Sequence, residues 1–197
     1  EITWRDWSSD VCSSDLVPLG SASVAQVHKA RLVGGELVAI KVQRPHVQEI
    51  MAQDISIMSS LAKRASRLMG DEQFLDLQSV VNELWQSFLE ETDFLVEVRS
   101  LTEFRRNNAD CKFVDCPMPY PKLCTEHVVV MNYVDGIPIG DNDRLVREGY
   151  DLEEIGTKLV DNFAQQILDD GFFHADPHPG NLQITWQIGR ASCRERV

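Results

Sequence analysis

A short loop rich in proline and glycine constrains this chain more than any other stretch. The loop runs from Gly171 to Asn181 and reads GFFHADPHPGN. Proline fixes φ and lacks a backbone donor, so this run is predicted to be a rigid loop and not a helix. It presents a carboxylate, Asp176, and an amide, Asn181, to one place. The flanking apolar residues are expected to bury the base of the loop: Ile167, Leu168, Phe172 and Phe173.

The pairing of Asp176 with Asn181 suits the chemistry of phosphoryl transfer. A carboxylate accepts the proton of an attacking hydroxyl or orients the nucleophile, and an amide oxygen helps to hold Mg²⁺. The pattern H-x-D-x-x-x-x-N from His174 to Asn181 has moderate specificity, because a plain surface turn can carry the same residues. A functional interpretation therefore needs support from elsewhere in the chain.

Composition limits the class of protein. The 197 residues suffice for one or two small domains, and a hydrophobic share of 43% is ordinary for a globular protein. The net charge of −12 argues against general nucleic-acid binding, which needs a basic face. No apolar run approaches the roughly 18 residues of a membrane span, and no signal peptide is visible. Three cysteines between the end segments fit no common zinc spacing and are expected to be reduced: Cys111, Cys116 and Cys124.

The two ends differ in character from the middle. Residues 1–16 contain Ser-Ser-Asp twice without clear periodicity, and residues 187–197 turn abruptly basic. Both segments resemble translations of short-read sequencing adapters, and we interpret them as non-native. Natural disordered tails are the alternative. The first interpretation predicts that the native sequence continues beyond residues 17–186 in both directions.

The middle of the chain predicts a mixed α+β domain. Apolar positions alternate on both sides of a turn at Gly34-Gly35, which predicts a β-hairpin with Leu37–Val42 as the return strand. Helical periodicity follows at Glu49–Leu68 and again up to Leu89, with Asp71 as the expected cap of the second helix. The remaining predicted elements are a loop at 107–121, a strand at 128–133, a turn at 135–136, helices at 142–148 and 152–168, and a strand that begins at 182.

A lysine among apolar strand residues, Lys41, is unusual. Taken alone, it is typical of an edge strand from which the ammonium reaches water. An acidic run further on places Asp93 and Glu97 on one face of a predicted helix, and such a face is commonly solvated. The functional hypothesis is that Glu97 pairs with Lys41 and orients it toward nucleotide phosphates. The small residues Gly20–Ser23 would let backbone N–H groups approach phosphate oxygens closely.

Together these parts resemble the UbiB family of atypical protein-kinase-like ATPases. Residues 18–28 are similar to its alanine-rich loop, residues 38–45 to its third strand, and residues 174–181 to its catalytic loop. Glu91 and Asp93 match its E-x-D motif. The resemblance implies an α+β, protein-kinase-like two-lobed fold that is incomplete, with added helices in the N-lobe and a partial helical C-lobe. The implied boundaries are 17–136 for the N-lobe with its hinge and 137–186 for the partial C-lobe.

The resemblance also implies roles for individual residues. Asp176 would be the catalytic aspartate, Lys41 would contact the α- and β-phosphates of ATP, and Glu97 would hold Lys41. Asn181 would ligate Mg²⁺, while Glu91 and Asp93 would belong to a cover over the substrate side. The implied nucleotide-binding residues are Gly20, Ser21, Ala22, Ser23, Val24, Ala39, Lys41, Met131, Tyr133 and Val134.

By this resemblance the chain is expected to bind Mg-ATP as an atypical kinase or ATPase that supports ubiquinone biosynthesis. The implied location is cytoplasmic, with membrane association through segments C-terminal to this sequence. The implied partners are membrane lipid or quinone-biosynthesis proteins, and not nucleic acid. Two alternatives stay open: a phosphotransferase of the aminoglycoside or choline kinase type, and a non-catalytic nucleotide-binding scaffold. Because the sequence lacks the family's K-x-G-Q and D-F-G motifs, the 197-residue chain is expected to be a poor catalyst.

Overall fold

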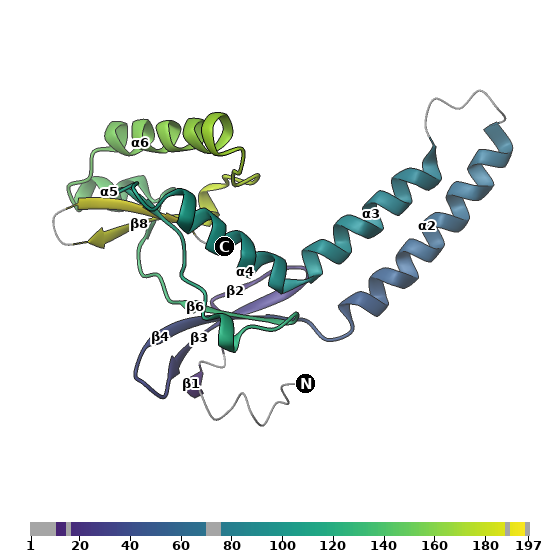
Figure 1. Ribbon diagram of the computed structural model, residues 1–197, viewed down its shortest axis with the longest axis horizontal. Coiled ribbons are helices and arrows are strands. Elements are labelled where there is room, and N and C mark those ends of the chain that lie inside the picture. The colour runs from purple at the N-terminus through teal and green to yellow at the C-terminus, as the bar shows by residue number, and fades with distance from the viewer. Residues whose placement is uncertain (1–10, 15–16, 70–75, 188–189, 196–197) are drawn as a thin grey trace.

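The computed structural model describes residues 11–14, 17–69, 76–187 and 190–195, and these form two small β-sheets linked by helices (Figure 1). The first sheet has the order β1-β3-β4-β6, with β2 paired to β3, and all of its pairs are antiparallel. Its strands are β1 (Val11–Ser14), β2 (Gly20–Ser21), β3 (Ala25–Leu32), β4 (Leu37–Gln43) and β6 (Val128–Asn132). The second has the order β5-β9-β8-β7, from β5 (Val114–Asp115), β9 (Arg190–Glu195), β8 (Leu182–Gln187) and β7 (Ile137–Pro138).

The predicted β-hairpin is confirmed as β3 and β4. Gly35 adopts a φ of 90°, which favours glycine, and the turn sets a register that pairs Val27 with Lys41. Strand β4 lies between β3 and β6, so it is an interior strand of the sheet. The interpretation of Lys41 as an edge-strand lysine is therefore wrong.

Helices α2 (Val47–Met69) and α3 (Leu77–Thr92) form a hairpin that projects away from both sheets (Figure 1). Both helices were predicted. The N-cap of α3 is Asp76, whose side chain accepts a hydrogen bond from the backbone N–H of Gln78 at 3.0 Å. The expected cap, Asp71, lies outside the described residues.

Helix α4 (Phe94–Asn107) joins two hydrophobic cores. Phe94 and Val98, near its start, pack with the first sheet in one core. Leu101 and Phe104, one and two turns later, pack in a second core with Ile184 and with the C-terminal helices. The C-terminal helices are α5 (Asn142–Arg147) and α6 (Leu152–Gln165). The structure also contains a π-helical turn, η3 (Gln166–Asp170), and two 3₁₀ turns, η2 (Pro121–Leu123) and η4 (Pro179–Asn181).

The apolar residues flanking Gly171 do not bury the loop base as expected. Side chains of Ile167, Leu168 and Phe173 are 52%, 80% and 50% exposed. Only Phe172 packs, partly buried, against the second core. The expectation that this run forms a buried base is wrong, because Ile167 and Leu168 are exposed in η3 and Phe173 is exposed in the loop that follows it.

The end segments contain β1 and β9, which pair with β3 and β8 respectively. The non-native origin of the end segments stays a prediction, which sequencing of the source DNA across residues 16–17 and 186–187 tests. The boundary between the lobes at residues 136–137 also stays a prediction. In the parts of the chain that the structure describes, no helix combines the length and the hydropathy that crossing a membrane requires.

Gly136, between β6 and β7, lies so close to the backbone of β8 that there is no room for a side chain. A Cβ atom there would lie 2.7 Å from the backbone oxygen of Ile184 in β8. We expect Gly136→Ala to destabilise the domain by about 1–3 kcal/mol, because backbone and not a flexible side chain would have to move. Thermal unfolding should show a melting temperature lower by roughly 2–4 °C per kcal/mol.

Gly156 in α6 is the matched control, because a Cβ atom there would meet no other part of the protein within 4 Å beyond its own helix backbone. Gly156→Ala should instead stabilise the protein by about 0.5–1 kcal/mol through helix propensity. If Gly136→Ala leaves the melting temperature unchanged, the close approach of β8 does not constrain this turn.

Candidate nucleotide-binding site

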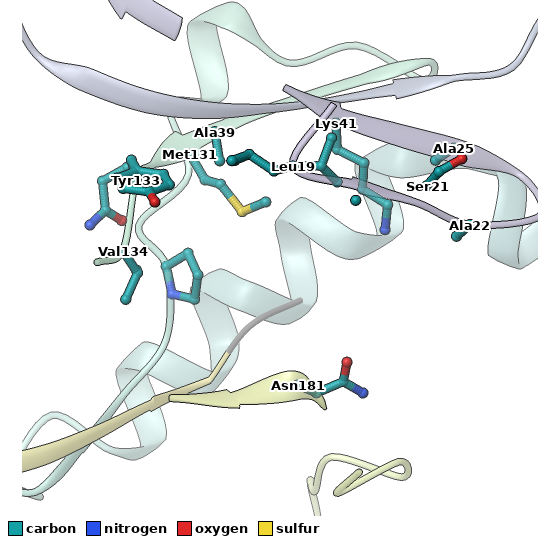
Figure 2. A pocket seen from close by; sticks show the side chains of 14 residues that line it. Leu19, Ser21, Ala22, Ala25, Ala39, Lys41, Met131, Tyr133, Val134 and Asn181 are labelled. Atoms are coloured by element: carbon teal, nitrogen blue, oxygen red, sulfur yellow. The ribbon is translucent and has the colours of Figure 1, made fainter. Parts of the chain in front are cut away.

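A cavity of about 290 Å³ lies between the first sheet and the start of β8 (Figure 2). This size is near the lower end of small-molecule sites, which span roughly 300–1,000 Å³. Eight of the ten predicted nucleotide-binding residues line it. They are Gly20, Ser21, Ala22, Ala39, Lys41, Met131, Tyr133 and Val134. The other two, Ser23 and Val24, lie in the turn between β2 and β3, outside the lining residues.

Lys41 and Glu97 meet at the edge of this cavity. Lys41 Nζ donates a hydrogen bond to Glu97 Oε2 at 2.7 Å, and the two side chains are 20% and 16% exposed. The ammonium also lies 5.1 Å from the ring centroid of Phe94, where a cation–π attraction adds to the ion pair. Glu97 Oε1 is buried and has no hydrogen-bond partner among the described residues. Lys41 thus balances the charge of this partly buried carboxylate.

The start of α4 is anchored to the first sheet, which places Glu97 one turn into the helix. Gln43 at the end of β4 donates to the carbonyl of Thr92 at 3.0 Å, and Phe94 N–H donates to the Glu126 carbonyl at 3.0 Å. Thr92 is fully buried, and its hydroxyl donates to the Phe88 carbonyl at 2.9 Å.

The acidic run is not one continuous helix. Asp93 is the N-cap of α4, and its side chain accepts from Leu95 N–H at 3.0 Å. Its second contact is an exposed ion pair with Arg99 at 3.7 Å. Glu91 is exposed in the last turn of α3, and neither acid lines the cavity. Helix capping is therefore the role that the structure gives Asp93, and the proposed cover role of the E-x-D motif stays a prediction.

The loop from His174 to Asn181 is held by its own side chains. The imidazole Nδ1 of His174 accepts from Asp176 N–H at 3.0 Å, and His178 Nδ1 accepts from Gly180 N–H at 3.0 Å. Asn181 Nδ2 donates to the backbone oxygen of Asp176 at 3.2 Å and to its Oδ2 at 3.3 Å. The structure thus brings the predicted catalytic carboxylate and the predicted metal ligand together, and Asn181 also lines the cavity opposite Lys41.

The donor set at this loop fits Mg²⁺ only together with a bound phosphate. Because Asn181 donates through Nδ2, its Oδ1 is left as the acceptor beside Asp176. Mg²⁺ commonly takes one or two protein oxygens and completes its shell with phosphate and water. Among the described residues, no cluster of three or more His, Cys, Asp or Glu is arranged to hold a metal by itself.

Sequence reasoning missed several lining residues. Val27 lies opposite Lys41 in the β3–β4 register, and the position of the Gly34-Gly35 turn could have revealed that pairing. Pro117 and Asn132 also line the cavity, and Asn132 Oδ1 accepts from the backbone N–H of Met118. These contacts join distant segments, so no local pattern indicates them.

Arg44 is a further residue whose role the sequence did not show. Its Nε donates to the Ala22 carbonyl at 3.0 Å, and its Nη2 donates to the Ser21 hydroxyl. The guanidinium at the end of β4 therefore holds the small-residue loop against the sheet.

Cys124 belongs to the same hydrophobic core as Phe94, whose ring lies against Lys41. Burial raises the pKa of the Cys124 thiol, and the negative charge of Glu97 raises it further. The thiol donates to the Tyr120 carbonyl at 3.2 Å. Within the described residues Cys111, Cys116 and Cys124 are thiols and not members of a disulfide.

The fold and the site define a protein-kinase-like domain. The Mycobacterium tuberculosis protein Rv3197, solved with erythromycin, superposes with a TM-score of 0.74 at 26% identity, over 96% of this chain and 47% of that one. The Rio2 kinase of Chaetomium thermophilum, solved with ADP, Mg²⁺ and phosphoaspartate, superposes with a TM-score of 0.51 at 14% identity, over 96% of this chain and 48% of the kinase. The second likeness shows the fold alone.

A family model described as the ABC1 atypical kinase-like domain matches residues 6–190, and the chain belongs to that family. A Clostridium pasteurianum protein described as "Uncharacterized protein in hydrogenase 1 5'region" is 44% identical over 170 residues, which cover 86% of this chain and 32% of the relative. A "Probable protein kinase UbiB" of Pseudomonas putida is 37% identical over 171 residues, 87% of this chain and 32% of the relative. The chain thus spans about a third of the length of these relatives, and the UbiB resemblance is confirmed.

Proposed function

We propose that this domain binds Mg-ATP in the cavity and acts as an atypical kinase or ATPase. Lys41 would contact the α- and β-phosphates, the small-residue loop at Gly20–Ser23 would cover them, and the hinge at Met131–Val134 would hold the adenine. Asp176 would orient the group that attacks the γ-phosphate or accept its proton. Asn181 would supply one oxygen to Mg²⁺, which neutralises phosphate charge when bound.

The ion pair between Lys41 and Glu97 is the observation that carries this proposal. In kinase-like sites a strand lysine is held by a helix glutamate so that its ammonium faces the phosphates. Here the two atoms lie 2.7 Å apart, beside a cavity whose opposite side presents Asn181. Eight predicted residues, from β2 and the turn after it, from β4 and from the hinge, line that same cavity.

For the biological role, we propose that the protein supports ubiquinone biosynthesis at a membrane. The support is the name UbiB carried by several relatives at about a third sequence identity. Membrane association would come from parts of those longer proteins that this chain does not cover. ABC1 membership favours this role over a small-molecule phosphotransferase of the aminoglycoside or choline kinase type.

Nucleotide binding is the direct test of the proposed site. We expect the complete gene product to bind a fluorescent ATP analogue in the presence of Mg²⁺, and unlabelled ATP to displace it. Chelation of Mg²⁺ by EDTA should weaken binding, because phosphate charge is then balanced by Lys41 and backbone N–H groups alone. Titrations with ATP and GTP would measure whether the hinge prefers adenine to guanine, and titration with ADP would measure the contribution of the γ-phosphate.

Two outcomes would contradict the proposal. Absence of ATP binding with and without Mg²⁺ would remove the nucleotide site altogether. Binding without any hydrolysis or transfer would instead favour the non-catalytic scaffold.

A further inference from the structure

Three buried side-chain amides connect α4 with the loop that carries Asp176. They are Asn108, Asn162 and Gln166, which we call the amide ladder, and they are 5%, 2% and 2% exposed. Asn108 is the C-cap of α4, Asn162 lies in α6, and Gln166 begins η3. Polar side chains are seldom this buried unless their donors and acceptors are paired, so the arrangement of their hydrogen bonds is informative.

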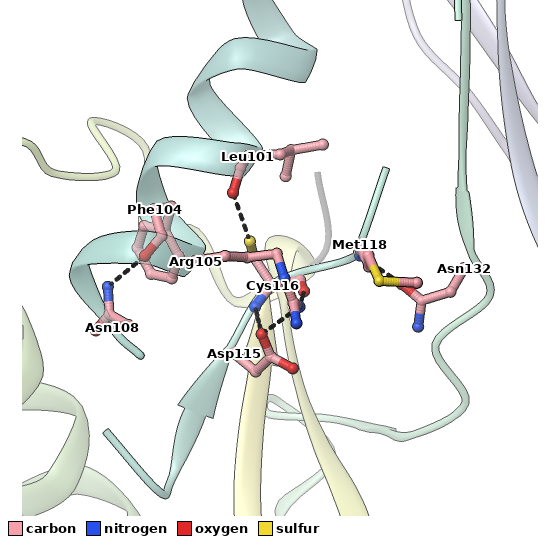
Figure 3. Close-up of polar contacts among 8 residues, drawn as sticks. All are labelled: Leu101, Phe104, Arg105, Asn108, Asp115, Cys116, Met118 and Asn132. Carbon is pink, nitrogen blue, oxygen red and sulfur yellow. Dashed lines mark hydrogen bonds and ion pairs between the residues drawn. The ribbon is translucent and has the colours of Figure 1, made fainter. Parts of the chain in front are cut away.

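The hydrogen bonds of the amide ladder run in one direction. His174 N–H donates to Gln166 Oε1 at 3.1 Å, and Gln166 Nε2 donates to Asn162 Oδ1 at 2.6 Å. Asn162 Nδ2 donates to Asn108 Oδ1 at 2.7 Å. Asn108 Nδ2 donates to the Phe104 carbonyl in α4 at 3.1 Å, the bond drawn in Figure 3. Each amide therefore accepts through oxygen and donates through nitrogen, and such chains strengthen each bond in a low-dielectric interior.

The two ends of the ladder lie on the two halves of the proposed active site. At one end α4 carries Glu97, which holds Lys41. At the other end Gln166 holds the backbone of His174, and the His174 imidazole in turn holds the backbone N–H of Asp176 at 3.0 Å. The ladder thus joins the helix that sets the phosphate anchor to the loop that sets the carboxylate.

We propose that Asn108, Asn162 and Gln166 are positioning residues that fix the Asp176 loop relative to α4. This inference rests on the proposed function, because the loop must hold a reacting carboxylate for its position to affect turnover. The ladder itself does not line the cavity, so its loss should lower kcat and leave the KM for ATP within about twofold. A displacement near 1 Å of a catalytic group costs up to about 100-fold in rate.

The test uses Gln166→Met in the complete protein, because methionine has nearly the same volume and lacks both polar groups. We expect kcat for ATP to fall by about 10- to 100-fold, since His174 N–H and Asn162 Oδ1 lose their partner. Asn108→Ala should lower kcat to a similar level. Each single variant already interrupts the chain of hydrogen bonds, so the double variant should have about the same kcat as either of them. Such non-additivity would be informative because these two side chains share no hydrogen bond.

Two control variants separate positioning from stability. Gln165→Met makes the same substitution one residue earlier, at a side chain without a ladder contact, and should retain kcat. Ile155→Val removes one methylene from the core beneath α6, so it should lower the melting temperature while retaining kcat. If Gln166→Met keeps kcat within twofold, or if Ile155→Val loses as much kcat at an equal drop in melting temperature, the ladder is not a positioning network.

Hydrogen exchange in the unmutated protein gives a second measurement that needs neither folding of a variant nor activity. The His174 N–H lies in a loop but should exchange as slowly as amides of α6, because it donates to a buried carbonyl. Exchange as fast as in the exposed parts of the loop would overturn the inference. Slow exchange in a protein that shows no ATP turnover would support the ladder while contradicting the proposed function, so the two failures are distinguishable.

Discussion

Asp176→Asn is expected to lower the rate of ATP turnover by about 100- to 10,000-fold while leaving Mg-ATP affinity within about threefold. The asparagine has the same shape and can still accept a hydrogen bond from Asn181, which lies 3.3 Å from Asp176 Oδ2. The loop geometry should therefore survive, while the group that accepts a proton or orients the nucleophile is lost. Steady-state hydrolysis and equilibrium binding, measured on the complete protein, separate the two effects.

Asp161→Asn in α6 is the matched control for this prediction. It makes the same change of charge at an exposed acid outside the loop and should retain full turnover. Undiminished hydrolysis by Asp176→Asn would show that another group carries the chemistry. If the unmutated protein and both variants bind Mg-ATP and none of them turns it over, the domain is a nucleotide-binding scaffold.

Local patterns predicted the N-lobe well because its elements are close in sequence. The β3–β4 hairpin is specified by alternation around Gly34-Gly35, and its register follows from the position of that turn. The order of the motifs then predicted that Lys41 and Glu97 lie together, although the two residues are too far apart in sequence for any local pattern to indicate it. The sequence analysis placed Asp93 within a helix, whereas the structure makes it the N-cap of α4, a position that aspartate favours.

In helix α6 and the turn after it, the apolar residues do not form one buried face. Ile155, Leu159, Phe163 and Ile167 recur at spacings of four. A helix advances about 100° per residue, so each step of four drifts about 40° and Ile167 lies about 120° from Ile155. The buried side chains are Ile155, Asn162 and Gln166, which stay within one face.

The amide ladder was invisible for a related reason. Asparagine and glutamine are typical of surfaces, and the partner of Asn162 is Asn108, which lies 54 positions away. Only the packing of α6 against the end of α4 converts these polar residues into a buried network. The predicted catalytic loop was therefore identified from its own residues, while the elements that hold it were not.

Lys41→Met is expected to weaken Mg-ATP binding by about 10- to 150-fold, because a charged hydrogen bond of this kind is worth about 1.5–3 kcal/mol. Fluorescence titration of the complete protein measures the change. Lys63→Met on α2 is the control, since it removes the same charge from an exposed helix outside the cavity. Equal affinities for Lys41→Met and the unmutated protein would contradict the role of Lys41 as a phosphate anchor.

The same substitution should also reveal the energetics of the partly buried ion pair between Lys41 and Glu97. Without Lys41, the Glu97 carboxylate keeps a buried Oε1 and loses its only ionic partner among the described residues. An unpaired buried charge is more costly than a neutral amide, so Lys41→Met should melt at a lower temperature than the double variant Lys41→Met/Glu97→Gln. Neither variant should bind ATP tightly, because Glu97→Gln removes the unpaired negative charge but does not replace the lost ammonium of Lys41. If the double variant is the less stable of the two, Glu97 is stabilised by groups other than Lys41, and the ion pair does not hold α4 against the first sheet.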